Sequence, residues 1–185
     1  MIKKAVISSL LIGSSLFADT NVEVEDPYHF YMEIGTTFGG DNIAENDDGG
    51  RGGDDYHAGG GAVLGAGIII DIADNYKYQA RTLVAYRYQG GDGSNSGVVV
   101  ESLLAYRVLD SMTVGAGIHA DFANKIKTVD DETIKFDDSI GGMFMLEWSS
   151  TPTMSLGAKY ILSEYKSNSE VFDGNQLGVY LQIRY

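Results

Sequence analysis

Apolar and polar residues alternate along most of the chain after residue 27. In the clearest stretch, Met112, Val114, Ala116 and Ile118 alternate with glycines and polar residues. A period of two is typical of a β-strand with two different faces. Eight such stretches occur, beginning near residues 28, 62, 78, 98, 112, 140, 154 and 176. The pattern therefore predicts eight strands.

The connections between these stretches alternate in length. Longer polar connections fall at about 40–57, 90–96, 124–138 and 164–174, and shorter ones at about 71–77, 109–111 and 149–153. Bacterial outer-membrane barrels combine an even number of strands with short periplasmic turns and longer outer loops. We therefore predict an all-β fold, an eight-stranded antiparallel up-and-down transmembrane β-barrel over residues 28–185, with outer loops centred near residues 48, 93, 131 and 169.

The two faces of the predicted strands differ in composition. The apolar face has no charged residue in any stretch, which favours contact with lipid over a soluble, lipocalin-like barrel. Its aromatic residues gather near the strand ends, as Trp148 and Tyr86 do. The other face mixes glycines with four acids and five bases, which we interpret as a charge network inside the lumen. Its predicted members are Glu33, Arg81, Arg87, Glu101, Arg107, Asp121, Glu147, Lys159 and Arg184.

The first eighteen residues have the pattern of a secretory signal peptide. Lys3 and Lys4 precede an apolar run over residues 5–17, and Ala18 supplies a small residue at the cleavage point. The run is shorter than the roughly 20 residues that a membrane-spanning helix requires. We therefore predict export, with residues 1–18 removed and residues 19–27 forming a short acidic periplasmic segment.

The last strand ends in a recognisable way. Leu177, Val179, Leu181, Ile183 and Tyr185 alternate with other residues and finish on an aromatic ring. In this feature and in its architecture the chain resembles the small outer-membrane β-barrel family, which includes the barrel domain of OmpA and the OmpX-like proteins. The resemblance implies that these residues act as an insertion signal for the outer-membrane assembly machinery, and that the protein is a monomer in the outer membrane.

Composition excludes several other classes. The net charge of −13 argues against a nucleic-acid partner, and the lack of cysteine excludes disulfides and thiolate metal sites. Because the predicted lumen set is nearly balanced, the acidic excess lies outside it. We therefore expect Mg²⁺ or Ca²⁺ to strengthen association with outer-membrane lipid and lipopolysaccharide.

The first long connection is the most acidic one. Its spacing does not reproduce a known calcium loop, so we predict no metal site and no cofactor, and treat the acids as a solvated loop or, by composition alone, a divalent-cation candidate. These residues are Asp41, Glu45, Asp47, Asp48, Asp54 and Asp55.

The three histidines, His29, His57 and His119, are the candidates for enzymatic chemistry. Some barrels of this family are lipid A-modifying enzymes, and their deacylases carry a His-x-Ser motif. The nearest match here is His119-Ala-Asp121, which lacks the serine nucleophile. We therefore predict a non-enzymatic structural or surface-interaction protein, with a role in adhesion or envelope integrity. The alternatives are a narrow porin-like channel and, less favoured, a lipid A-modifying enzyme.

Overall fold

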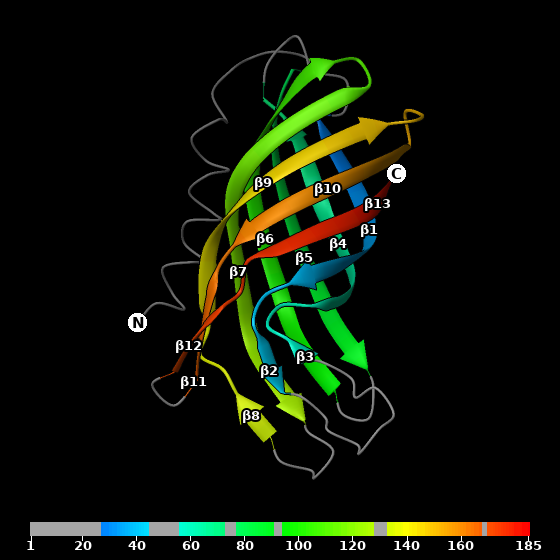
Figure 1. Ribbon diagram of the computed structural model, residues 1–185. Coiled ribbons are helices and arrows are strands. Elements are labelled where there is room, and N and C mark those ends of the chain that lie inside the picture. The colour runs from blue at the N-terminus through cyan, green and yellow to red at the C-terminus, as the bar shows by residue number, and fades with distance from the viewer. Residues whose placement is uncertain (1–26, 45–55, 73–76, 91–93, 128–132, 168–169) are drawn as a thin grey trace.

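Eight long strands close into a single antiparallel barrel, which confirms the predicted fold (Figure 1). Each strand pairs with the next long strand along the chain, and the pairing of the last with the first closes the sheet. The barrel strands are β1 (Tyr28–Gly39), β4 (Gly61–Asp71), β5 (Tyr78–Gly90), β6 (Ser94–Leu109), β7 (Met112–Lys127), β9 (Ser139–Ser149), β10 (Met154–Leu162) and β13 (Gln176–Arg184). The computed structural model describes residues 27–44, 56–72, 77–90, 94–127, 133–167 and 170–185.

The outward face of the barrel is apolar. In β1, Phe30 and Ile34 are 62% and 57% exposed, whereas the intervening Tyr31 and Glu33 are buried. The aromatic residues Tyr78, Tyr86 and Trp148 also point outward and are exposed. Such a continuous exposed apolar surface is the one that lipid covers in a transmembrane barrel. Among the described residues, no helix is long and apolar enough to cross a membrane.

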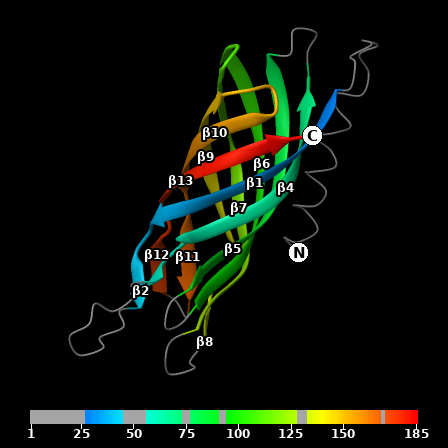
Figure 2. The ribbon, with the colours of Figure 1, turned by 90° about the vertical axis from the view of Figure 1, so that its right-hand side faces the viewer.

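Five short strands extend the barrel at the end where the longer connections lie (Figure 2). They are β2 (Asn42–Ala44), β3 (Tyr56–His57), β8 (Thr133–Lys135), β11 (Glu164–Ser167) and β12 (Glu170–Asp173). Here β2 pairs with β3, β11 pairs with β12, and β8 pairs with the end of β7. We call these short strands, together with the adjoining ends of β6 and β7, the collar.

In the described part of the chain, short strands lie in three of the four longer connections, at 40–57, 124–138 and 164–174, and barrel strands extend into the connections at 90–96 and 124–138. Residues 90–96 were expected to be a polar connection, but β6 already begins at Ser94. Residues 124–138 were expected to be another, but β7 continues to Lys127 and β8 follows. The polar composition of both segments hid these strands, because strands that project beyond the lipid need no apolar outer face.

A β-bulge in β7 explains why alternation was lost there. Ser96 pairs with Lys125 and Val98 pairs with Phe122, so Ala123 and Asn124 together lie opposite Gly97. Ala123 has a positive φ of 55°. A Cβ at Gly97 would lie 1.9 Å from Asn124 Oδ1, so a larger residue opposite the bulge would displace the Asn124 side chain. The extra residue reverses the alternation along the strand. Odd-numbered residues such as Asp121 point inward before the bulge, and even-numbered residues such as Ile126 point inward after it.

Several predicted segments fall outside the described residues. They are the signal peptide over residues 1–18, residues 19–26 of the acidic segment that follows it, and Glu45, Asp47, Asp48, Asp54 and Asp55 of the acidic loop. The roles predicted for them stay predictions.

Candidate functional site

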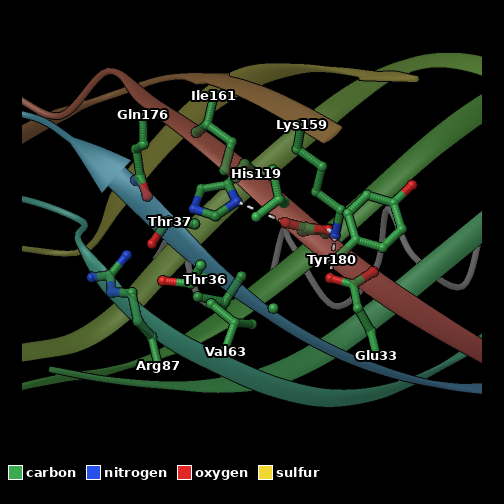
Figure 3. Close-up of a pocket in the computed structure, with 15 residues that line it drawn as sticks. Glu33, Thr36, Thr37, Val63, Arg87, His119, Lys159, Ile161, Gln176 and Tyr180 are labelled. Carbon is green, nitrogen blue, oxygen red and sulfur yellow. Dashed lines mark hydrogen bonds and ion pairs between the residues drawn. The ribbon is translucent and has the colours of Figure 1, made fainter. Parts of the chain in front are cut away.

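A lysine lies between two carboxylates in the middle of the lumen. Lys159 of β10 places its Nζ 2.5 Å from Glu33 Oε1 of β1 and 2.6 Å from Glu101 Oε2 of β6. The same ammonium lies 4.6 Å from the centre of the Tyr180 ring. Figure 3 shows Lys159 and Glu33 pointing toward one another beside that ring. All three charged side chains are buried, and a buried charge is tolerated only when it is paired in this way.

From this centre the polar contacts continue toward the collar. The two ring nitrogens of His119 lie 3.2 Å from Glu101 Oε1 and 3.0 Å from Asp121 Oδ2. Asp121 also accepts a hydrogen bond from Arg87 Nη1 at 3.0 Å and one from the Tyr165 hydroxyl. Burial raises the pKa of the Tyr165 phenol, which therefore stays protonated and donates to the carboxylate. Tyr165 belongs to β11, so the collar reaches into the barrel mouth and is tied to it.

A second group of ion pairs fills the lumen toward the short turns. Arg81 Nη1 lies 2.7 Å from Glu147 Oε2, and Arg184 Nη2 lies 2.6 Å from Glu147 Oε1. The Arg81 guanidinium also donates to Gln79 Oε1, at 2.7 Å from Nη2. Gln79 in turn donates to Asp71 at the end of β4. Two arginines therefore share one carboxylate, with a glutamine continuing the contacts to the barrel rim.

Aromatic side chains fill the space left by glycines on neighbouring strands. A Cβ at Gly157 would lie 2.2 Å from Cζ of Tyr180, and one at Gly67 would lie 2.5 Å from Cζ of Tyr31. Each ring therefore occupies the place that a side chain on the other strand would need. The cavities on the two sides of Lys159 measure about 20 Å³ and about 10 Å³. Each has room for about one water molecule, so the lumen is filled rather than open.

The structure brings together eight of the nine charged residues that were predicted to share the lumen. Arg107 is half-buried near the turns and makes no ion pair with any described residue. The polar partners Gln79, Asn124 and Tyr165 were not predicted, and neither was the role of Tyr180. The sequence offered one indication of these rings. Gly67 and Gly157 lie on the inner face, and glycines there leave space that a large side chain on a neighbouring strand has to fill.

The other predicted sites are placed as follows. Leu177, Val179 and Tyr185 point outward and are exposed, and Leu181 and Ile183 lie half-buried on the same face. Asp41, the described member of the acidic loop, accepts a hydrogen bond from the backbone of Asp173. Within the described ranges, no three histidine, aspartate or glutamate side chains gather in a way that could hold a metal ion.

The closed eight-stranded barrel, its apolar outer face and its filled polar lumen define the fold of the small outer-membrane β-barrels. Ail, the attachment invasion locus protein of Yersinia pestis, is similar with a TM-score of 0.55 and 13% identity, over 85% of this chain and 97% of Ail. Ail in complex with the heparin analogue sucrose octasulfate gives a TM-score of 0.50 at 10% identity, over 85% of this chain and 97% of Ail.

The outer membrane protein OprG of Pseudomonas aeruginosa gives a TM-score of 0.51 at 13% identity, over 85% of this chain and 95% of OprG. No protein-family model matches the chain, and no curated protein matches it in sequence. These likenesses show the fold, and function has to be argued from the residues of this chain.

Proposed function

We propose that the protein is a monomeric, non-enzymatic outer-membrane barrel that holds its collar at the cell surface for adhesion or envelope integrity. The observation that carries this proposal is the filled lumen. Ion pairs around Lys159 and Glu147 and the rings of Tyr31 and Tyr180 fill the lumen, and the cavities beside Lys159 measure about 20 Å³ and 10 Å³. An eight-stranded barrel has an interior just wide enough for side chains to fill, which favours a scaffold over a transport role.

The collar supports a role in binding because it has a small core of its own. Ile126, Phe136 and Tyr165 are buried together with Ala58, and Ile134 and Phe172 pack against them. Phe136 meets the rings of Tyr165 and Phe172 edge to face. Segments held on a rigid frame beyond the membrane are the usual place for recognition.

Location is the first part of the proposal to test. The apolar outer face and the likeness to Ail and OprG support insertion in the outer membrane, and the predicted signal peptide would supply the export step. We expect the protein to fractionate with the outer membrane and to change its mobility in detergent gels on heating. Recovery in the soluble periplasmic fraction would contradict the proposal.

The adhesion role is tested by a loop variant. Replacing residues 45–55 with a short Gly-Ser linker removes much of the acidic loop and leaves every described strand in place. We expect the variant barrel to keep its heat-dependent gel mobility, while expressing cells bind less to immobilised extracellular-matrix proteins. Unchanged adhesion across this variant and one lacking residues 164–173 would argue for an envelope role instead.

A narrow porin-like channel is the second candidate, because charged contacts run along the lumen from Gln79 and Arg81 to Tyr165. Planar-bilayer recording distinguishes a closed barrel from a channel. The filled lumen predicts no stable conductance steps for the wild-type protein. Reproducible steps that disappear in Arg81→Ala or Glu101→Gln would overturn the closed-barrel proposal.

The enzyme alternative rests on His119, whose ring nitrogens face the carboxylates of Glu101 and Asp121. Carboxylates hold an imidazole in place but supply no hydroxyl nucleophile of the kind that a lipid deacylase needs. We expect identical lipid A mass spectra from cells with and without the protein. An acyl chain lost or gained in a His119-dependent manner would overturn the non-enzymatic assignment.

A further inference from the structure

Four exposed lysines gather on the outer side of the collar, next to the bulge. Lys125 and Lys127 lie on β7 beyond the bulge, Lys135 lies on β8, and Lys166 lies on β11. They alternate with inward-pointing residues such as Ile126, so their side chains face away from the lumen. Among the described lysines and arginines outside the predicted lumen set, Lys77 is the only other one. We call these four residues the lysine cluster.

Strand pairing brings these lysines close together. Lys125 and Lys135 are directly opposed across β7 and β8. The strand β11 lies beside the segment after β8, because Asp137 N donates to Lys166 O at 2.9 Å and Ser167 Oγ donates to Lys135 O at 3.1 Å. Within the described part of the chain, no ion pair involves any of the four side chains. Like charges in direct opposition destabilise a sheet, so the fold leaves a charge that an anion would offset.

The cluster lies at a defined height on the barrel. One row of paired residues runs across four strands from Tyr88 through Ser96 and Lys125 to Lys135. Two residues closer to the barrel centre, the next outward row contains Tyr86, Val98 and Phe122. The two rows are about 7 Å apart, and aromatic rows of this kind mark the edge of the hydrocarbon layer.

The row beyond the lysine pair is also free of acids. It runs from Gly90 through Ser94 and Lys127 to Thr133. Exposed acids border the cluster on two sides, because Glu164 lies two residues before Lys166 on β11 and Asp137 and Asp138 follow shortly after Lys135. The opposed Lys125 and Lys135, together with Lys127, therefore place three positive charges at the level just outside the hydrocarbon where lipid phosphates lie.

We propose that the lysine cluster binds the phosphate groups of the lipid A headgroup in the outer leaflet directly. This inference rests on the proposed outer-membrane location and names a lipid partner for it. It differs from the expectation drawn from the sequence, in which an acidic exterior meets lipopolysaccharide only through divalent cations. The positive charge of the lysines favours an anionic ligand. Their position next to the aromatic row, at the edge of the hydrocarbon layer, favours a lipid headgroup over a soluble anion.

The test compares two lipids on the folded, full-length mature protein. Native mass spectrometry from detergent micelles containing EDTA measures binding of bisphosphorylated lipid A and of its dephosphorylated form. We expect the wild type to prefer the phosphorylated lipid, and Lys125→Gln/Lys135→Gln to lose about 10- to 30-fold in apparent affinity, because each lysine near an anionic surface contributes about fivefold. Lys77→Gln, an exposed lysine at the opposite rim, should keep the wild-type affinity.

Two further variants separate loss of charge from loss of fold. Lys125→Arg/Lys135→Arg keeps the charge and should bind like the wild type, and Lys127→Gln provides a milder variant if the double glutamine variant loses its heat-dependent gel mobility. If EDTA abolishes lipid A binding and the lysine substitutions leave it unchanged, divalent cations bridge the protein to the lipid and the proposal is wrong. Equal affinity for inorganic phosphate would overturn the choice of a lipid. Periplasmic fractionation would refute the proposed location without altering these affinities.

Discussion

The middle of the lumen and its collar end are filled by different chemistry. In the middle, Lys159 is held by Glu33 and Glu101, and Glu147 by two arginines. At the collar end, the buried Ile126 and Phe136 pack around Tyr165, whose hydroxyl donates to the buried Asp121 of the barrel. The difference teaches that filling the lumen and holding the surface segments are separate tasks. Paired charges packed among apolar residues such as Leu83 and Met143 accomplish the first, and a small apolar core accomplishes the second.

The largest expected effect comes from removing the central cation. Lys159→Met leaves Glu33 and Glu101 buried in the lumen without their shared partner. Breaking a buried pair from one side costs about 3–5 kcal/mol. Urea unfolding in micelles, followed by the heat-modifiable gel band, measures the loss. Lys159→Met/Glu33→Gln should recover part of it, and Lys166→Met on the exposed face should change little. A loss below about 1 kcal/mol would show that the middle does not depend on paired charge.

The matching change at the collar end is Ile126→Ala. Ile126 is fully buried in the collar core, and truncation of a buried isoleucine costs about 2–4 kcal/mol. We expect the effect to stay local, so that amides of β8 and β11 exchange hydrogen faster while those of the barrel strands do not. Hydrogen exchange with mass spectrometry reads both regions at once. Equal acceleration throughout the barrel would show that the two regions unfold as one unit.

A smaller effect is expected where a ring meets a glycine. Gly157→Ala would place a Cβ 2.2 Å from Cζ of Tyr180, so the ring or the strand has to move. Overpacking of this kind costs about 1–3 kcal/mol. Gly142→Ala is the matched control, because a Cβ there meets no atom within 4 Å. If both variants unfold at the same urea concentration, the ring does not fill the lumen as tightly as the structure indicates.

The smallest effect concerns the bulge that separates the two regions. Ala123 has a φ of 55°, which glycine adopts without a steric penalty. Ala123→Gly should therefore raise the free energy of unfolding by up to about 1 kcal/mol. Ala116→Gly, in the regular part of β7, should lower it by a similar amount. A loss of stability in both variants would contradict the strain assigned to the bulge.

The barrel wall was predictable from the sequence because lipid imposes a simple rule on one face. Phe30 and Ile34 in β1 share a face that is mostly apolar and free of charge, as do their counterparts in the other strands. The collar was not predictable in this way. Beyond Ala123 the bulge reverses the phase of β7, and Lys125 and Lys127 take the outward positions that lipid no longer constrains.

The charged residues of the lumen were predictable as a set but not as pairs. Alternation places Arg81, Glu147 and Lys159 on the inner face, yet their partners depend on the register and stagger of strands far apart in the chain. Arg81 of β5 meets Glu147 of β9 across the lumen, without direct pairing of the two strands. Tyr165 was missed for a related reason, since it comes from a polar hairpin that folds back over the mouth.

The seam between β1 and β13 has a consequence for assembly. Tyr31 pairs with Arg184, so the two ends of the described chain meet in one ladder of hydrogen bonds. Until β13 is in place, β1 would present a row of unpaired amide and carbonyl groups to hydrocarbon, at a cost of several kcal/mol for each group. The seam therefore makes insertion close to all-or-none. A partly inserted intermediate would leave this edge unpaired until the last strand arrives.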